Sequence, residues 1–169
     1  MSSISKSVKY WVLYSLIFPM GMFPGNYIRQ LVLPWFTRRC GRRFWVYPNV
    51  HIFAIEGLVC GDYVNIAYNV YLNCSGGVSI GSYTGIGPHS SIQSTIHNYP
   101  KGQLWRNSGD TIRPVTIGSD CLIGAGCHIL PGTELGDSCV VLPGSVVSGK
   151  YEGNMIIGGN PARVVKRRE

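Results

Sequence analysis

Apolar residues in the second half of the chain recur at every sixth position. Over residues 117–147 this spacing holds without a slip, and a small residue stands four places after most of the apolar ones. Glycine directly follows the apolar residue in several repeats, so that each unit reads I-G-x-x-small-x. The apolar series is Ile117, Ile123, Ile129, Leu135, Val141 and Val147, and the small series is Cys121, Cys127, Thr133, Cys139 and Ser145.

A period of six predicts a parallel β-helix. A period of two indicates an ordinary strand and 3.6 a helix, whereas six residues with a glycine turn give one short strand followed by a bend. Three such units close a triangular coil of about eighteen residues, whose equivalent apolar side chains stack in the interior. Two earlier blocks share the period and bring the prediction to about four to five coils. They are Val46, Ile52, Leu58, Val64 and Val70, and then Ile80, Ile86 and Ile92.

Two insertions interrupt the period. One adds about four residues near 75–78, and the other spans residues 98–116, directly after His97. A loop as long as the second one is usually functional or disordered when it lies inside a compact domain. Because loops carry binding and catalytic residues on a rigid scaffold, we expect the chemistry of this protein at the second insertion.

Residues 1–45 form a helical, basic and apolar segment ahead of the repeat. Lys6 and Lys9 precede the run YWVLYSLIF, which looks like the start of a signal peptide, but no A-x-A-like cleavage site follows. Pro19 and Gly21 end the run far short of the ~20 residues that a membrane-spanning helix needs. We therefore expect neither a cleaved signal nor a transmembrane helix.

A second short helix is expected next, with Asn26 as its cap and Pro34 as a kink. Two interpretations of its apolar face stay open. The face could lie on an anionic membrane surface, helped by the basic residues behind it. Alternatively, it covers the first coil or packs against a neighbouring subunit, because the terminal repeats of a solenoid need capping. The face comprises Ile28, Leu31, Val32, Trp35 and Phe36, and the basic residues are Arg38, Arg39, Arg42 and Arg43.

Length and charge limit the domain organisation and the partners. The chain has 169 residues, which suits one domain with appendages, so we predict a β-helix over 46–152 and an extended basic tail over 153–169. The net charge is +7 and both ends are basic, which favours anionic lipid or a phosphorylated ligand. No groove-reading or RNA-binding motif accompanies these charges, so we expect no nucleic-acid partner.

Three of the 6 cysteines fall at multiples of the period, at Cys121, Cys127 and Cys139. A repeat that needs a small residue at one turn explains this regularity better than a disulfide framework does. We therefore expect reduced thiols and a cytoplasmic protein.

The six-residue pattern and the ending GGNPARVVKRR resemble the hexapeptide-repeat acyltransferases over roughly residues 40–166. Within that family the chain looks most like the galactoside and maltose O-acetyltransferases and the exopolysaccharide or O-antigen acetyltransferases. The resemblance implies an all-β, left-handed parallel β-helix, acetyl-CoA as the acyl donor, and a sugar or glycan precursor as the acceptor, with no metal. It also implies a homotrimer whose active sites lie between subunits.

The segment that starts at His97 is similar to the protruding loop whose first histidine is the family's catalytic base. A histidine accepts a proton near neutrality as a hydroxyl attacks a thioester, and such a base typically contributes ~10²–10⁴-fold. We therefore predict His97 as the general base. Trp105 and Asn73 are the candidate acceptor contacts, although Asn73 could equally close a turn. The other histidines, at outward-facing positions, are His51, His89 and His128.

The resemblance places the acyl donor along the last coils and the tail. Ala125 and Pro143 match positions whose backbone groups bind pantetheine, and Ser148 and Lys150 match the later turn. The tail residues that the resemblance places near the nucleotide end are Asn160, Arg163 and Lys166.

Direct transfer is favoured over a covalent acyl-enzyme, because the inward cysteines are poorly placed for attack. Three alternatives stay open: a zinc-dependent γ-class carbonic anhydrase on the same scaffold, a non-catalytic scaffold, and an N-acetyltransferase acting on an amino sugar. The spacing of His89, His97 and His128 does not resemble that of the zinc enzyme. Because the N-terminal segment is basic and apolar, where galactoside-type enzymes are acidic, we expect a lipid-carried precursor of a surface polysaccharide at the inner membrane face.

Overall fold

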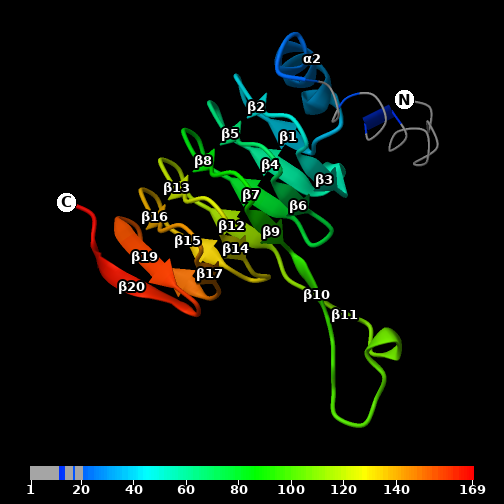
Figure 1. Ribbon diagram of the computed structural model, residues 1–169, viewed down its shortest axis with the longest axis vertical. Coiled ribbons are helices and arrows are strands. Elements are labelled where there is room, and N and C mark those ends of the chain that lie inside the picture. The colour runs from blue at the N-terminus through cyan, green and yellow to red at the C-terminus, as the bar shows by residue number, and fades with distance from the viewer. Residues whose placement is uncertain (1–11, 14–16, 18–20) are drawn as a thin grey trace.

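The computed structural model describes residues 12, 13, 17 and 21–169. Lys6, Lys9 and most of the apolar run that follows them lie outside the described residues. The body is a column of stacked coils with a long arm projecting from its side, and helix α2 (Gly25–Val32) and the C-terminal strands lie at its two ends (Figure 1). Within the described ranges, no helix combines the length and the apolar character needed to cross a membrane.

Three sheets of parallel strands form the walls of the column, which confirms the parallel β-helix. The first wall contains β1 (Arg39–Cys40), β4 (Leu58–Cys60), β7 (Val78–Ile80), β12 (Val115–Ile117), β15 (Glu134–Leu135) and β18 (Lys150–Tyr151). The second wall contains β2 (Trp45–Val46), β5 (Asn65–Ile66), β8 (Gly85–Ile86), β13 (Leu122–Ile123), β16 (Val140–Val141) and β19 (Met155–Gly159), followed by the antiparallel β20 (Ala162–Arg167). The third wall contains β3 (His51–Phe53), β6 (Tyr71–Asn73), β9 (Ser91–Gln93), β14 (His128–Ile129) and β17 (Val146–Val147).

The first wall has six strands, so the column has about six turns and the prediction of four to five coils was too low. Strand β1 pairs in parallel with β4 although it precedes the first apolar position that the repeat pattern identified. At the other end, β18 pairs with β15 after the last recognised repeat. The additional turn comes from these terminal strands. Each is an edge strand of the first wall and pairs with a coil on one side only, so its residues follow the repeat less strictly.

The early coils are longer than the late ones, which corrects the predicted frame. Hydrogen-bonded partners in adjacent coils are 20 residues apart between Arg42 and Asp62, and 18 apart between Ser119 and Asp137. The extra residues lie at the corner after the third wall, where a short 3-10 helix, η3 (Ile55–Gly57), forms in one coil. An insertion does lie near 75–78 as predicted, but it supplies only part of the extra residues, because the preceding coil is lengthened at the same corner.

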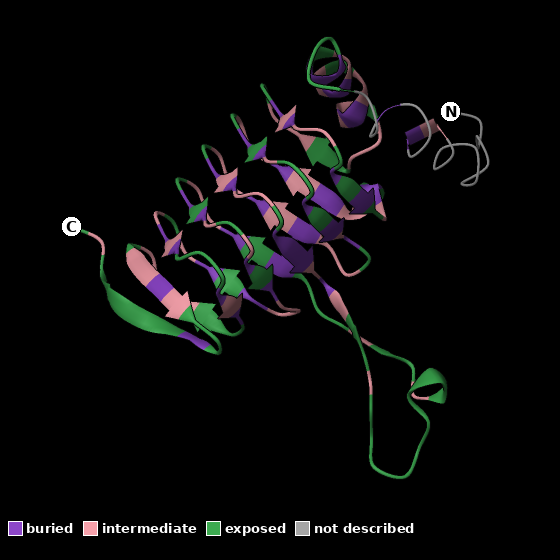
Figure 2. Ribbon diagram, in the orientation of Figure 1, coloured by how far each residue is buried: buried purple, intermediate pink, exposed green. Residues whose placement is uncertain are grey.

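As a result, Leu58, Val64 and Val70 do not continue the interior column that Val46 begins. In the structure Val46 stacks on Ile66, and Ile66 on Ile86. The three misassigned residues belong to a second buried column, the one that later holds the small residues. Figure 2 shows buried positions in the strands along the length of the column. Both columns are apolar in the early coils, so a six-residue spacing fits either of them.

The glycine of the repeat is required by the close approach of neighbouring coils. A Cβ atom added at Gly124 would lie 2.6 Å from the backbone nitrogen of Pro143 in the next coil, and one at Gly118 would lie 2.6 Å from that of Asp137. No side chain fits at such distances, so the glycine allows one coil to stack directly on the next.

Helix α2 caps the first coil with a polar residue. The buried guanidinium of Arg29 donates hydrogen bonds to the carbonyl oxygens of Val46 at 2.7 Å and Gly21 at 3.2 Å, and to the side chain of Asn26. The predicted helix cap at Asn26 is wrong, because the helix begins one residue earlier and Asn26 lies inside it as a partner of Arg29. Leu33, in the 3-10 helix η2 (Leu33–Trp35), is also buried, whereas Leu31 and Trp35 are exposed.

All six cysteines are free, and every one except the half-buried Cys40 is buried in the core. Burial raises the pKa of the Cys74 thiol to about 12 and that of Cys121 to about 11. A thiol with such a pKa stays protonated at neutral pH, and the thiolate is the nucleophilic form. The interior cysteines therefore stabilise the core as small apolar residues.

We expect Gly124→Ala to lower the free energy of unfolding by about 1–3 kcal/mol, because the new methyl group meets the backbone of the next coil. Gly85→Ala is the matched control, since its Cβ would sit 3.6 Å from the Leu122 side chain in ordinary contact. Chemical denaturation of both variants measures the difference. Equal stabilities would contradict the proposed role of close coil stacking.

We expect iodoacetamide to alkylate Cys74 and Cys121 at neutral pH at least about a hundredfold more slowly in the native protein than in the unfolded chain. The reason is that these thiols are both covered and protonated. Mass spectrometry of peptides after timed labelling measures each site. Rapid labelling of either thiol in the native state would show that it is accessible as a thiolate.

Candidate active site

A projecting arm carries His97, the predicted general base. Its two strands, β10 (Thr95–His97) and β11 (Asp110–Ile112), pair antiparallel and leave the column at the corner between the third and first walls (Figure 1). Ser94 anchors the base of the arm, because its hydroxyl donates to the Asn73 carbonyl at 2.6 Å and accepts from the Gly76 amide at 2.8 Å. The insertion predicted to begin after His97 therefore forms a hairpin.

His97 and Asp110 face each other across this hairpin and form a hydrogen-bonded pair. They are opposite each other in the strand register, and His97 Nδ1 lies 2.5 Å from Asp110 Oδ1. An ionised carboxylate can only accept hydrogen bonds, so Nδ1 of the imidazole carries the proton and donates it. In the neutral imidazole the other ring nitrogen, Nε2, then carries no proton and can act as a base.

Further contacts hold the arm in shape. The Thr111 hydroxyl donates to the Asn98 side-chain oxygen at 2.6 Å, and the Asn98 amide donates to the Ser108 carbonyl at 3.0 Å. Trp105 lies in the short 3-10 helix η4 (Trp105–Asn107), and its ring centroid is 5.3 Å from that of His97. The structure thus brings the predicted Trp105 against the predicted base.

His97 borders hollows on both sides of the arm. One hollow, with a volume of about 630 Å³, lies between the arm and the corners of the later coils, and Ser148 and Arg113 line it together with His97. A second hollow, of about 530 Å³, lies between the arm and the earlier coils. The imidazole is exposed, with 68% of its side chain accessible, so a substrate can reach it from either side.

Asn73 lines the second hollow together with His97 and Asp110. Its side-chain oxygen accepts hydrogen bonds from the backbone nitrogen of Ser75 at 3.1 Å and the Ser75 hydroxyl at 2.8 Å. The two interpretations of Asn73 from sequence are therefore compatible, because the residue closes a turn and also borders the candidate site.

The predicted cofactor residues divide between two edges of the third wall and the end of the column. Ala125 and Pro143 precede strands β14 and β17, whereas Ser148 follows β17 at the corner beneath the arm. Among these predicted residues, all of them described, Ser148 alone lines a hollow with His97. Lys150 forms an ion pair with Glu134 at 2.8 Å. Asn160 lies at the turn between β19 and β20, and Arg163 and Lys166 are exposed on β20.

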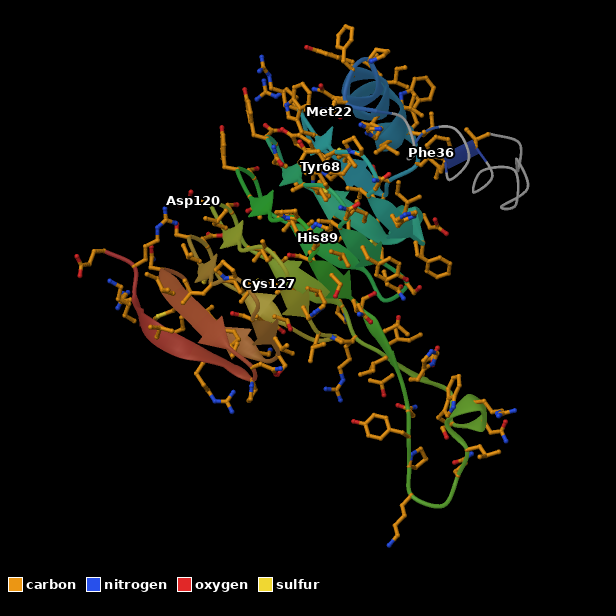
Figure 3. All side chains as sticks on the ribbon, viewed as in Figure 1. Met22, Phe36, Tyr68, His89, Asp120 and Cys127 are labelled. Atoms are coloured by element: carbon orange, nitrogen blue, oxygen red, sulfur yellow. The ribbon has the colours of Figure 1, made fainter. Side chains whose placement is uncertain are left out.

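The other histidines are on the outer surface of the coils, as predicted. His51, His89 and His128 are all exposed, and His128 is hydrogen-bonded to the Ser91 hydroxyl at 2.8 Å. Figure 3 shows the labelled His89 on the coil body, away from the arm. Among the described residues no group of three or more His, Cys, Asp or Glu side chains is placed to hold a metal ion.

Two residues of the site were missed from sequence. Asp110 is the only acidic residue between positions 63 and 119, and it stands near the far end of the insertion that His97 begins. That position could have identified Asp110 as a partner of His97, because the two ends of a loop meet at its base. Arg113, exposed at the hollow of Ser148, carried no signal beyond its charge.

Comparisons with known proteins agree with this architecture. Residues 114–149 match the family described as bacterial transferase hexapeptide (six repeats). A protein of Escherichia coli K12 described as a colanic acid biosynthesis acetyltransferase, WcaF, is 28% identical over 140 residues, which cover 83% of this chain and 75% of that protein.

Two solved structures share the fold. A maltose O-acetyltransferase from Clostridium difficile 630 superposes with a TM-score of 0.85 at 26% identity, covering 95% of this chain and 86% of the other. A galactoside acetyltransferase in complex with coenzyme A gives a TM-score of 0.85 at 23% identity, covering 100% of this chain and 86% of the other. The repeat, the stacked coils and these similarities show that the chain shares the hexapeptide repeat and the coiled fold of these acetyltransferases.

Proposed function

We propose that this chain transfers the acetyl group of acetyl-CoA to a hydroxyl group of a sugar, with His97 as the general base. The observation that carries the proposal is the accessible His97–Asp110 pair on the arm, with Nε2 free and hollows on either side. The solved galactoside acetyltransferase of the same fold holds coenzyme A, which supports a CoA thioester as the donor.

The proposed reaction needs a single base that returns its proton. As the acceptor oxygen attacks the thioester carbonyl, its proton passes to Nε2 of His97, and a tetrahedral intermediate forms. The carbon–sulfur bond then breaks, and the imidazolium gives the proton to the departing CoA sulfur. Asp110 keeps the Nδ1 proton in place and stabilises the imidazolium between the two steps. Direct transfer of this kind requires no enzyme nucleophile, in keeping with the protonated interior thiols.

We propose that the donor lies between neighbouring subunits of a homotrimer. Within one chain Ala125 and Pro143 are at the opposite edge of the third wall from Ser148, so a donor contacting both sets fits best between two columns. In this arrangement backbone groups at Ala125 and Pro143 contact pantetheine. Asn160, Arg163 and Lys166 contact the nucleotide end, where the two cations face the phosphates. Lys150 joins them by leaving Glu134.

The proposed acceptor is a glycan precursor for a surface polysaccharide, made in the cytoplasm. The relative named for colanic acid biosynthesis supports this class of acceptor. Asn73 and Trp105 border the arm and are proposed to contact the sugar, since an amide pairs with hydroxyl groups and an indole ring stacks on a sugar face.

We expect His97→Ala to lower kcat by ~10²–10⁴-fold, because the acceptor hydroxyl loses its base. Release of the CoA thiol from acetyl-CoA, measured over a panel of neutral and amino-sugar precursors, gives the rate for each acceptor. His128→Ala, a change of an exposed histidine outside the site, is the matched control. Turnover that does not respond to His97→Ala would refute the proposed mechanism.

We expect Asp110→Asn to lower kcat by at least about tenfold while leaving the KM for acetyl-CoA unchanged. An asparagine amide can donate to Nδ1, which would place the imidazole proton on Nε2 and block the base. Asp110→Glu should recover part of the activity, because it retains the acceptor charge. A residue with only a structural role would instead lower the melting temperature and raise KM along with the loss of kcat.

A further inference from the structure

Large apolar side chains form a solvent-facing ridge along α2. Phe23, Tyr27, Leu31 and Trp35 recur every four residues, and the spacing of Tyr27 and Leu31 aligns them on one side of α2. Phe23, in the turn before the helix, lies with its ring centroid 5.9 Å from that of Tyr27, and Trp35, in η2, borders one apolar hollow with Leu31. Their exposed fractions include 82% for Phe23, 72% for Leu31 and 84% for Trp35. Figure 3 shows side chains projecting outward around this helix, with Met22 and Phe36 labelled, at the end of the column. We call these four residues the α2 ridge.

Capping of the column does not account for the α2 ridge. The first coil is covered by the opposite side of the helix, where Arg29 and Leu33 are fully buried and Asn26 nearly so. Tyr27 also contacts the column at its edge, with its ring centroid 5.8 Å from that of Trp45. The face predicted to cover the coil is thus half-buried against the core at Ile28, Val32 and Phe36, whereas Leu31 and Trp35 face solvent. Exposed apolar surface of this kind on a soluble domain usually marks an interaction site.

Positive charge accompanies the α2 ridge. Arg38 and Arg39 follow it directly and are exposed, and the first 55 residues of the chain contain no aspartate or glutamate. Arg42 is paired with Asp62 at 3.1 Å, so Arg38 and Arg39 are the cations nearest the ridge for which no acidic partner is seen among the described residues. An apolar helical face with aromatic residues and neighbouring cations matches the chemistry of the lipid–water interface.

We propose that the α2 ridge inserts into the interfacial layer of an anionic phospholipid bilayer, with Arg38 and Arg39 against the lipid phosphates. The apolar side chains then leave water, and the arginines gain the negative surface potential of the lipid headgroups. The inference rests on the N-terminal surface and is independent of the proposed acetyl transfer.

Charge argues against a second copy of the chain as the occupant. A symmetric contact in which two ridges run parallel would bring the Arg38 and Arg39 ends of both copies together, and like charges at an interface are repulsive. If the ridge instead bound a different surface of a second copy, Arg38 and Arg39 would favour an acidic surface there. Four of the eight acidic residues already bond basic side chains: Asp62 with Arg42, Asp110 with His97, Asp120 with Arg168, and Glu134 with Lys150.

Flotation of the full chain with vesicles tests the proposal. We expect the wild type to float with vesicles of phosphatidylglycerol and phosphatidylcholine in equal parts, and to bind pure phosphatidylcholine at least about tenfold more weakly. The double change Leu31→Ser with Trp35→Ser should weaken binding to the mixed vesicles by at least about tenfold, whereas Leu31→Met with Trp35→Phe should retain it. Arg38→Gln with Arg39→Gln should reduce the preference for anionic vesicles, and added salt should reduce the binding of the wild type.

Matched controls separate the outcomes. Leu122→Ser removes an exposed leucine outside the α2 ridge, and His97→Ala removes the proposed base, so both should float like the wild type. The proposal is overturned if the wild type does not float, if the serine double variant floats equally, or if pure phosphatidylcholine binds as well. A change in oligomeric mass of that variant without vesicles, measured by light scattering, would also overturn it by placing the ridge between subunits.

Discussion

Stacking of one coil directly on the next is the constraint on which the rest of this structure depends. Parallel strands in adjacent coils lie at hydrogen-bonding separation, about 4.8 Å, so backbones at the corners approach until a glycine is needed. The added Cβ atoms at Gly118 and Gly124 would meet the next coil at 2.6 Å. Side chains that point inward must be small or apolar. What remains free to vary are the outward positions, the corner insertions and the two ends of the column.

The candidate active site is built on a corner insertion. An insertion at the corner between the third and first walls becomes a hairpin, and the hairpin brings two residues 13 apart in sequence into a hydrogen bond. The regular coils beneath provide a rigid base and border the hollow through Ser148. The interior provides no comparable chemistry, because burial keeps thiols such as Cys74 protonated.

The two ends of the column also differ from the regular coils. The second wall begins at β2, and the Val46 carbonyl on that strand points away from the column with no earlier coil to pair with it. Arg29 supplies the missing donor, and apolar residues such as Leu33, Ile28 and Val32 pack on this end of the column. The α2 ridge is then free for another contact. At the other end β20 turns back on β19 and continues the second wall by antiparallel pairing.

Sequence alone determined the period of six, the parallel β-helix, the small residues of the second column and the position of His97 at the start of the long insertion. These are local properties, because the repeat is written along the chain and each unit carries its own strand and turn. The tertiary structure decided which of two buried columns Val64 and Ile66 join, since both are fully buried and apolar and the spacing fits either. It also decided that Asp110 meets His97, that Arg29 faces the coil in place of Leu31, and that Ala125 and Ser148 lie at opposite edges of one wall. Each of these depends on the register between residues far apart in the chain, and a one-dimensional pattern does not contain that register.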